Sequence, residues 1–194
     1  MSDEDRIRWD QRYGDGAYET RTHPSALLAQ WIDRLPRGRA LDVACGAGRN
    51  SLWLAKHGYS VTSVDISSVA LDRLRRAADG LAVATVEVDL DHGLPELQGR
   101  FDLIIKMRFM NLSLLHSLFE RLGPGGVLVC EILLQGGDAS VGPSFGPLAP
   151  RFRAAPGVLL NAAKGLQVMY YDEGPVMDPD GRVVYLARLI GRRL

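Results

Sequence analysis

Residues 40–51 read Ala-Leu-Asp-Val-Ala-Cys-Gly-Ala-Gly-Arg-Asn-Ser, an apolar run with one acid that ends in a glycine-rich turn. The turn leads into a stretch of helical composition, and a second apolar run, 60–64, then ends in Asp65. A strand, a glycine turn, a helix and a second strand with a terminal acid form the first half of a nucleotide-cofactor site in an open α/β sheet. The stretch therefore predicts both a fold class and a bound cofactor.

The segments around this stretch continue the alternation of strand and helix. Apolar runs typical of strands occupy 39–43, 60–64, 82–88, 101–105 and 126–132. Helical segments lie between them, at 49–58, 67–79 and 111–122. Runs such as 101–105 are almost continuously apolar, as expected of parallel strands that are covered on both faces. We therefore expect an α/β fold with a doubly wound, mostly parallel sheet.

The N-terminal part departs from this alternation. Residues 1–38 contain two short segments with helical spacing, 4–12 and 24–35, and Pro24 suits the first turn of the second helix. We expect these helices to form a leader or cap, and residues 39–194 to form one compact domain.

The C-terminal part predicts a lid and a hairpin. Residues 134–157 are rich in glycine and proline, and a loop of this length is usually a lid or a binding loop. A short helix near 157–164 precedes two strands, 166–171 and 182–190. The ten residues between those strands are enough for a hairpin but too few for a helical crossover. The sheet should therefore have seven strands and end in an antiparallel one.

Composition limits the partners. The 194 residues are 46% hydrophobic and 24% charged, which is typical of a folded globular protein. Basic and acidic residues balance at 23 each, so charge gives no support to nucleic acid or an anionic membrane as the main partner. No apolar run approaches the length of a membrane span.

The two cysteines, Cys45 and Cys130, lie far apart in apolar segments, without a CxxC pair or a Cys/His cluster. Neither a disulfide framework nor a metal site is indicated. The first ten residues are polar and acidic rather than the apolar core of a signal peptide. We therefore expect a cytoplasmic protein.

The glycine turn and the two strand-end acids have physical roles. Gly46 and Gly48 lack Cβ atoms where the backbone must turn tightly and approach a ligand. The helix that starts near Arg49 offers N–H groups without intrahelical partners and a positive dipole end. Asp65, at the carboxyl end of the second strand, can accept hydrogen bonds from two ribose hydroxyls.

The details favour a cationic cofactor over a dinucleotide. Ser51 occupies the position where a dinucleotide site usually has its third glycine. Asp42 would oppose a phosphate but suits a sulfonium and an ammonium group, and Asp89, after the third strand, could read an adenine amino group. No Tyr-x-x-x-Lys pair occurs in the chain, which disfavours a nicotinamide enzyme.

Five stretches in this order resemble the motifs of the class I S-adenosylmethionine-dependent methyltransferases. They are Asp42-Val-Ala-Cys-Gly-Ala-Gly-Arg, Val64-Asp65-Ile-Ser, Val88-Asp89-Leu, Phe101-Asp-Leu-Ile-Ile and Gly123-Pro-Gly-Gly-Val-Leu. The resemblance covers about 40–132 and implies a Rossmann-like domain that binds S-adenosyl-L-methionine and transfers its methyl group. It implies a cofactor site formed by Arg21, Asp42, Ala44, Cys45, Gly46, Gly48, Asn50, Asp65, Ile66, Asp89, Leu90 and Lys106.

Within that class the chain resembles the tellurite-resistance methyltransferase branch. The similar segments are 18–23, 46–52, 166–173 and 181–182. No histidine follows His116, so the tail histidine proposed as functional in that branch has no counterpart.

Candidate acceptor-side residues follow the fourth and fifth strands, because α/β sheets place ligands at the carboxyl ends of strands. We predict roles for Arg108, Asn111 and Glu131; the alternatives are a surface arginine, a helix cap at Asn111 and a structural ion pair. Arg21 is a candidate for the methionine carboxylate.

Methyl transfer from a sulfonium is an in-line displacement that depends mainly on alignment and exclusion of water. A soft sulfur, selenium or tellurium nucleophile would need no general base. We therefore expect a small-molecule acceptor, with the oligomeric state, monomer or dimer, left open. The alternatives are a protein or RNA methyltransferase of the same fold and a non-catalytic cofactor-binding module.

Overall fold

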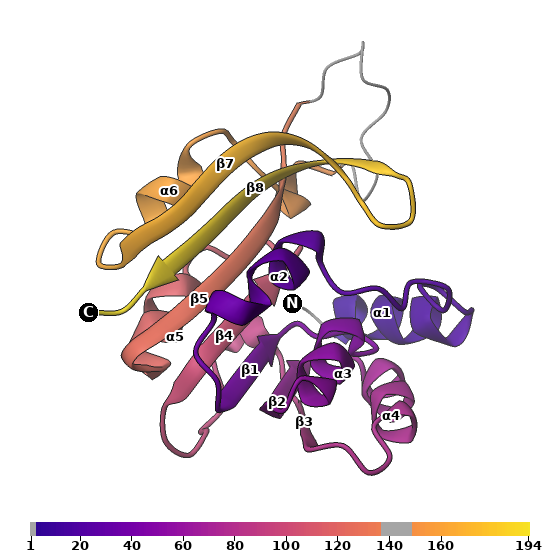
Figure 1. The fold of residues 1–194 in the computed structure, drawn as a ribbon. Helices are drawn as coiled ribbons and strands as arrows, with labels where there is room; N and C mark the ends of the chain where they lie inside the picture. Colours follow the sequence, from indigo (N-terminus) through magenta and orange to yellow (C-terminus); the bar gives the residue numbers. More distant parts are fainter. Residues whose placement is uncertain (1–2, 137–148) are drawn as a thin grey trace.

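The computed structural model of the protein describes residues 3–136 and 149–194. Their centre is one sheet with the spatial order β3-β2-β1-β4-β5-β8-β7 (Figure 1). The strands span Arg39–Val43 (β1), Ser60–Asp65 (β2), Val83–Glu87 (β3), Phe101–Met107 (β4), Leu122–Leu134 (β5), Gln167–Met177 (β7) and Val183–Arg192 (β8). The first five strands are parallel, whereas β8 is antiparallel to both of its neighbours, β5 and β7. The predicted α/β class, with a mostly parallel sheet and an antiparallel final strand, is confirmed.

One short strand was not predicted. The two residues of β6, Arg153–Ala154, pair in parallel with the end of β5 at Leu133 and Leu134. Two residues carry too little periodicity to be recognised in a sequence. Most of the predicted lid, residues 137–148 of 134–157, lies outside the described residues.

Helices cover both faces of the sheet. They span Asp3–Gly14 (α1), Ala26–Trp31 (α2), Arg49–Lys56 (α3), Ser68–Ala77 (α4), Leu114–Arg121 (α5) and Val158–Ala162 (α6). Short 3-10 turns lie at Ile32–Arg34, Leu90–His92 and Pro150–Phe152. None of the helices in these described ranges is long and apolar enough to span a membrane.

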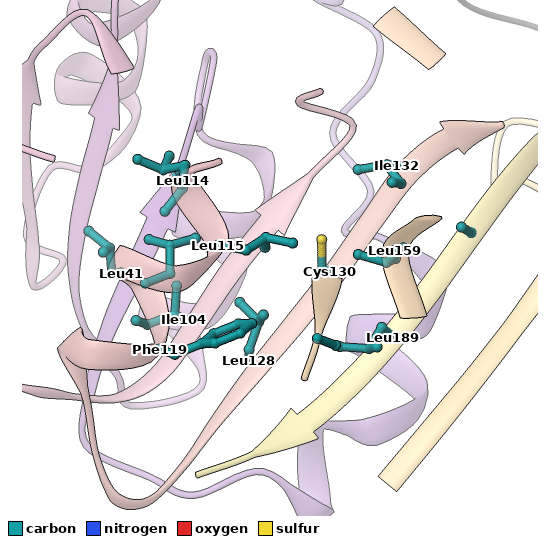
Figure 2. Packing of buried hydrophobic residues seen from close by; sticks show 14 of the residues in the cluster. Leu41, Ile104, Leu114, Leu115, Phe119, Leu128, Cys130, Ile132, Leu159 and Leu189 are labelled. Atoms are coloured by element: carbon teal, nitrogen blue, oxygen red, sulfur yellow. The ribbon is translucent and has the colours of Figure 1, made fainter. Parts of the chain in front are cut away.

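The alternation of side chains along β4 explains the two-layer core. Leu103 and Ile105 point to the face that packs on α2 and α3, whereas Ile104 points to the face that packs on α5. All three side chains are fully buried. Figure 2 shows the second face, with Leu115 of α5 and Leu159 of α6 over the sheet. Burial on both faces is why these strands read as continuous apolar runs.

The second leader helix begins later than its sequence predicts. Ser25, in an extended conformation, precedes α2, so Pro24 lies outside the first turn. The Ser25 backbone N–H donates to Asn50 Oδ1 at 2.9 Å, and its hydroxyl donates to Glu131 Oε1 at 2.5 Å. These long-range bonds hold Ser25 out of the helix. A sequence pattern cannot reveal them.

The C-terminal hairpin is longer and tighter than predicted. The ten-residue connection expected at 172–181 is wrong, because β7 continues to Met177 and the turn occupies only 178–182. Asp178 closes this turn by donating its N–H to the Arg182 carbonyl at 2.8 Å. Pro175 argued against a strand at this position in the sequence, but a proline is tolerated there because β7 is an edge strand.

Candidate active site

A cavity of about 780 Å³ lies at the carboxyl ends of β1, β2 and β4. The glycine turn after β1 and the loop after β4 form its walls, and leader residues Trp9, Tyr13 and Tyr18 also line it. The volume is within the range of roughly 300–1,000 Å³ that is usual for small-molecule and cofactor sites.

The cavity brings ten of the predicted site residues together. They are Arg21, Ala44, Cys45, Gly46, Gly48, Asn50, Asp65, Ile66, Leu90 and Arg108. In the described structure the other five predicted residues are not among its lining groups: Asp42, Asp89, Lys106, Asn111 and Glu131.

The glycine turn borders the cavity and also packs against the leader helix α1. Ala44, Gly46 and Gly48 all have positive φ angles, of 57°, 56° and 79°. A Cβ atom on Gly46 would lie 2.3 Å from the hydroxyl of Tyr13, which comes from the leader helix α1. Glycine at 46 therefore permits close docking of α1 over the turn.

Asp65 anchors the turn from the end of β2. Its Oδ2 accepts from the Gly46 N–H at 2.7 Å and its Oδ1 accepts from the Ser67 N–H at 2.9 Å. Burial raises the pKa of this carboxyl, although the backbone donors oppose the rise. The side chain is fixed in place and still borders the cavity.

Asp42 is buried near the end of β1, where the Ser51 side chain holds its carboxylate. The Ser51 hydroxyl donates to Asp42 Oδ2 at 2.6 Å and accepts from the Ser63 hydroxyl at 2.8 Å. Burial raises the pKa of Asp42 to about 7, against the opposing hydrogen bond from Ser51. The serine that replaces a third glycine therefore supports the first-strand acid.

The residues after β3 divide between two cavities. Leu90 and Asp91 line the main cavity, whereas Asp89 lines a smaller one of about 170 Å³ with Ile66. Asp89 Oδ1 accepts from the Asp91 N–H at 2.9 Å, which fixes the 3-10 turn that follows. The adenine role predicted for Asp89 stays a prediction.

Arg108 enters the cavity from the end of β4 in an unusual conformation. Its φ is 61°, in the left-handed region that non-glycine residues rarely adopt, and its N–H donates to the Glu131 carbonyl at 2.7 Å. Strained backbone of this kind often marks a functional position. The guanidinium forms an ion pair with Asp178.

Asp178 pairs with two arginines of the cavity and was not identified from the sequence. Its carboxylate bridges Arg108 and Arg21, and its side chain is only 3% exposed. Burial alone would raise the pKa of Asp178, but the hydrogen bond and charge of Arg108 bring it below its ordinary value. An Asp-Pro-Asp-Gly turn explains an aspartate without further roles, so local sequence concealed this one.

Three arginines from separate segments gather at this end of the cavity: Arg21, Arg49 and Arg108. Burial and the charges of the other two lower the pKa of Arg49 to about 10. Its Nη1 donates to the His23 carbonyl at 2.8 Å. The arrangement concentrates positive charge beside the glycine turn.

The remaining predicted residues support the site from outside. Asn111 caps α5, because its Oδ1 accepts from the Leu114 N–H at 3.1 Å. Lys106 is fully buried and donates to the Phe109 carbonyl at 2.5 Å, which closes the loop that carries Arg108. Burial lowers the pKa of Lys106.

Glu131 is buried behind the cavity with one oxygen unmatched. Its Oε1 accepts from the Ser25 hydroxyl, and its Oε2 has no hydrogen-bond partner among the described residues. No cluster of three His, Cys, Asp or Glu side chains suited to a metal occurs within 3–136 and 149–194.

Comparison with known proteins finds a match for the part of the chain that contains β1 to β4. Residues 40–126 match a family model described as a methyltransferase domain. The ribosomal RNA small subunit methyltransferase C of Alcanivorax borkumensis is 34% identical over 119 residues, 54% of this chain and 36% of the relative. The ubiquinone biosynthesis O-methyltransferase of Pseudomonas aeruginosa is 28% identical over 110 residues, 52% of this chain and 47% of the relative. The chain thus matches between a third and a half of these relatives' length.

Solved structures share the fold. TehB from Haemophilus influenzae superposes with a TM-score of 0.71 at 23% identity, covering 86% of this chain and 61% of that one. Magnesium protoporphyrin IX methyltransferase from Synechocystis PCC 6803, with bound SAH, gives 0.65 at 17% identity, covering 87% and 81%.

Proposed function

Because this chain carries a methyltransferase domain of the class I S-adenosylmethionine-dependent kind, we propose that it methylates a small-molecule acceptor. The observation that carries the proposal is the cavity of about 780 Å³, which joins the cofactor motif to the strand ends beneath the leader. The cytoplasmic location expected from the sequence stays a prediction.

The residues present suit S-adenosylmethionine. Asp65 keeps acceptor capacity for ribose hydroxyls after its two backbone bonds, because each carboxylate oxygen has two lone pairs. The turn at Gly46 and Gly48 leaves its backbone open to the cavity, and Leu90 offers an apolar surface to an adenine. Arg21 and Arg49 carry the positive charge that a methionine carboxylate needs.

When bound, S-adenosylmethionine supplies an electrophilic methyl group on a sulfonium. The chain's own residues then align the acceptor and exclude water. Met107, Phe109 and Met110 provide an apolar wall, and Tyr13 and Trp9 border the cavity on the leader side. Alignment of this kind lowers a barrier by roughly 7–11 kcal/mol without a covalent intermediate. We propose no general base, since an acceptor that arrives as a thiolate or selenide needs none.

RNA is the rival acceptor, because one relative is named as a ribosomal RNA methyltransferase. Phosphate contacts dominate RNA binding and require an excess of Lys and Arg. The chain has 23 basic and 23 acidic residues, which favours the small acceptor.

Two experiments test the proposal. Calorimetry with S-adenosylhomocysteine should show binding by the wild type, and Asp65→Ala should weaken it by about 10- to 100-fold, as loss of charge-assisted hydrogen bonds predicts. Asp79→Ala, an exposed acid outside the cavity, is the control. A radiolabelled methyl screen should then compare tellurite, selenite, thiols and phenols with total RNA and protein. No cofactor binding, or label only in RNA, would contradict the proposal.

A further inference from the structure

The guanidinium of Arg108 has donors that the protein does not use. Within the described residues its Nη2 pairs with Asp178, whereas its Nε is buried without a hydrogen-bond partner. A buried donor without a partner costs free energy unless a ligand or water satisfies it. Arg108 lines the cavity, and its side chain is 14% exposed.

Arg108 lies among several charged side chains. The charge of Arg108 lowers the pKa of both Arg21 and Arg49, and the charge of Arg21 also lowers the pKa of Arg49. Asp178 is shared between two of these arginines. Two other acids lie near: Asp180, 3.6 Å from Arg21 Nε, and Glu131, whose charge favours the charged form of Arg49. No ion pair joins Arg108 to either of them in the described structure.

Several apolar side chains line the same cavity as Arg108. Its neighbours in the chain, Met107, Phe109 and Met110, line the same cavity, as do Leu133 and Phe152. A ligand with an anionic end and an apolar body would suit both this arginine and these apolar side chains. A planar carboxylate matches the fork of a guanidinium better than it matches an ammonium.

We propose that Arg108 binds a carboxylate of the methyl acceptor, and that the acceptor is a compact carboxylic acid with an apolar body. This inference rests on the proposed function and names its substrate class. The carboxylate orients the acceptor, and a different atom of the same molecule receives the methyl group. Asp178, which pairs with Nη2, keeps the guanidinium in place as a positioning residue.

Calorimetry on the full chain saturated with S-adenosylhomocysteine tests the assignment. The probes are benzoate, phenylacetate and hexanoate, each compared with its primary amide. We expect the wild type to prefer at least one acid over its amide by about tenfold or more, and Arg108→Met to lose that preference. Lys164→Met, which removes an exposed cation outside the cavity, should keep it. Equal binding of every acid and amide would overturn the assignment, as would tighter binding of selenite than of all three acids.

The same variants separate an acceptor site from a cofactor site. Arg108→Met should bind S-adenosylhomocysteine and 5′-methylthioadenosine as the wild type does. Selective loss of S-adenosylhomocysteine would mean that Arg108 holds the cofactor's carboxylate, which overturns the acceptor role but leaves the proposed function intact. Failure of the wild type to bind S-adenosylhomocysteine would overturn both. If Arg108→Met does not fold, Arg108→Lys should retain cofactor binding and lose most of the preference for acids.

Discussion

At the scale of single residues, Asp178 decides how the acceptor end of the cavity is held. Its carboxylate meets Arg21, 157 positions away in the chain, and Arg108, 70 positions away. The pair partners are largely buried, so removing the carboxylate leaves charges that water cannot fully compensate.

Asp178→Asn should therefore lower the free energy of unfolding by about 2–4 kcal/mol at neutral pH, because it removes the negative charge that bridges two largely buried guanidinium groups. Urea denaturation followed by circular dichroism measures the change. Asp180→Asn, which removes a more exposed acid from the same turn, is the control and should cost less than about 1 kcal/mol. Equal losses in the two variants would show that the bridge contributes no special stability.

Asp42 makes stability depend on pH. Burial raises its folded pKa to about 7, above the ordinary value near 3.8, so the folded state holds a proton that the unfolded state releases. Stability from this group is present below about pH 4 and is lost as the pH rises through 7. Asp42→Asn removes this dependence. The stability of the variant relative to the wild type should therefore rise by about 2–3 kcal/mol between pH 5 and pH 8.

Urea titrations of the unliganded protein at several pH values measure this difference. Asp79→Asn, an exposed acid, is the control and should track the wild type. A constant difference between Asp42→Asn and the wild type would mean that Asp42 is ionised throughout.

At the scale of elements, the sequence predicted the strands and helices whose residue pattern is set by local burial. The parallel strands were found because burial on both faces leaves apolar runs, such as Phe101–Met107. The sequence did not predict the late start of α2, because Ser25 is held by partners far along the chain. It did not predict the length of β7, because a proline such as Pro175 is tolerated only in an edge strand. Element boundaries depend on such tertiary contacts.

The docking of α1 on the glycine turn gives a prediction at this scale. Gly46→Ala places a methyl group 2.3 Å from the Tyr13 hydroxyl, so α1 must shift, and its amide hydrogens should exchange faster. The double variant with Tyr13→Phe should recover part of the protection, because the nearest atom is gone while the strain at a positive φ remains. Gly58→Ala has a similar φ but no atom within 4 Å of its Cβ, and it should leave α1 unchanged. Exchange measured by mass spectrometry decides between these outcomes.

At the scale of the whole molecule, the resemblance to class I methyltransferases is confirmed and the cavity joins parts distant in sequence. The motif residues were identifiable because Gly46 and Asp65 belong to a contiguous strand-turn-helix-strand unit. Asp178 was not, because its role arises only when the hairpin folds back to Arg21 and Arg108. The sequence therefore indicated the cavity residues of the contiguous unit, and also Arg21 and Arg108, but it did not indicate the aspartate that joins those two arginines.

Binding of the cofactor product should also raise the thermal stability of the whole molecule. S-adenosylhomocysteine at 100 times its Kd should stabilise the wild type by about 2.7 kcal/mol, which corresponds to a rise in Tm of roughly 5–11 °C for a chain of this length. Asp65→Ala at the same ligand concentration should show a much smaller rise, whereas Asp79→Ala should match the wild type. Differential scanning fluorimetry makes the comparison. An equal rise in the Tm of Asp65→Ala would show that Asp65 takes no part in cofactor binding.

The strand order has a consequence for how the protein is made. The last strand, β8, lies between β5 and β7, both of which leave the ribosome before it (Figure 1). Until residues 183–192 emerge, β5 and β7 lack the strand that lies between them, and two strand edges with unpaired backbone groups are open to other chains. Folding of the nascent chain therefore depends on residues 183–192, and a ribosome that stalls before they emerge would expose a surface suited to chaperones or to aggregation.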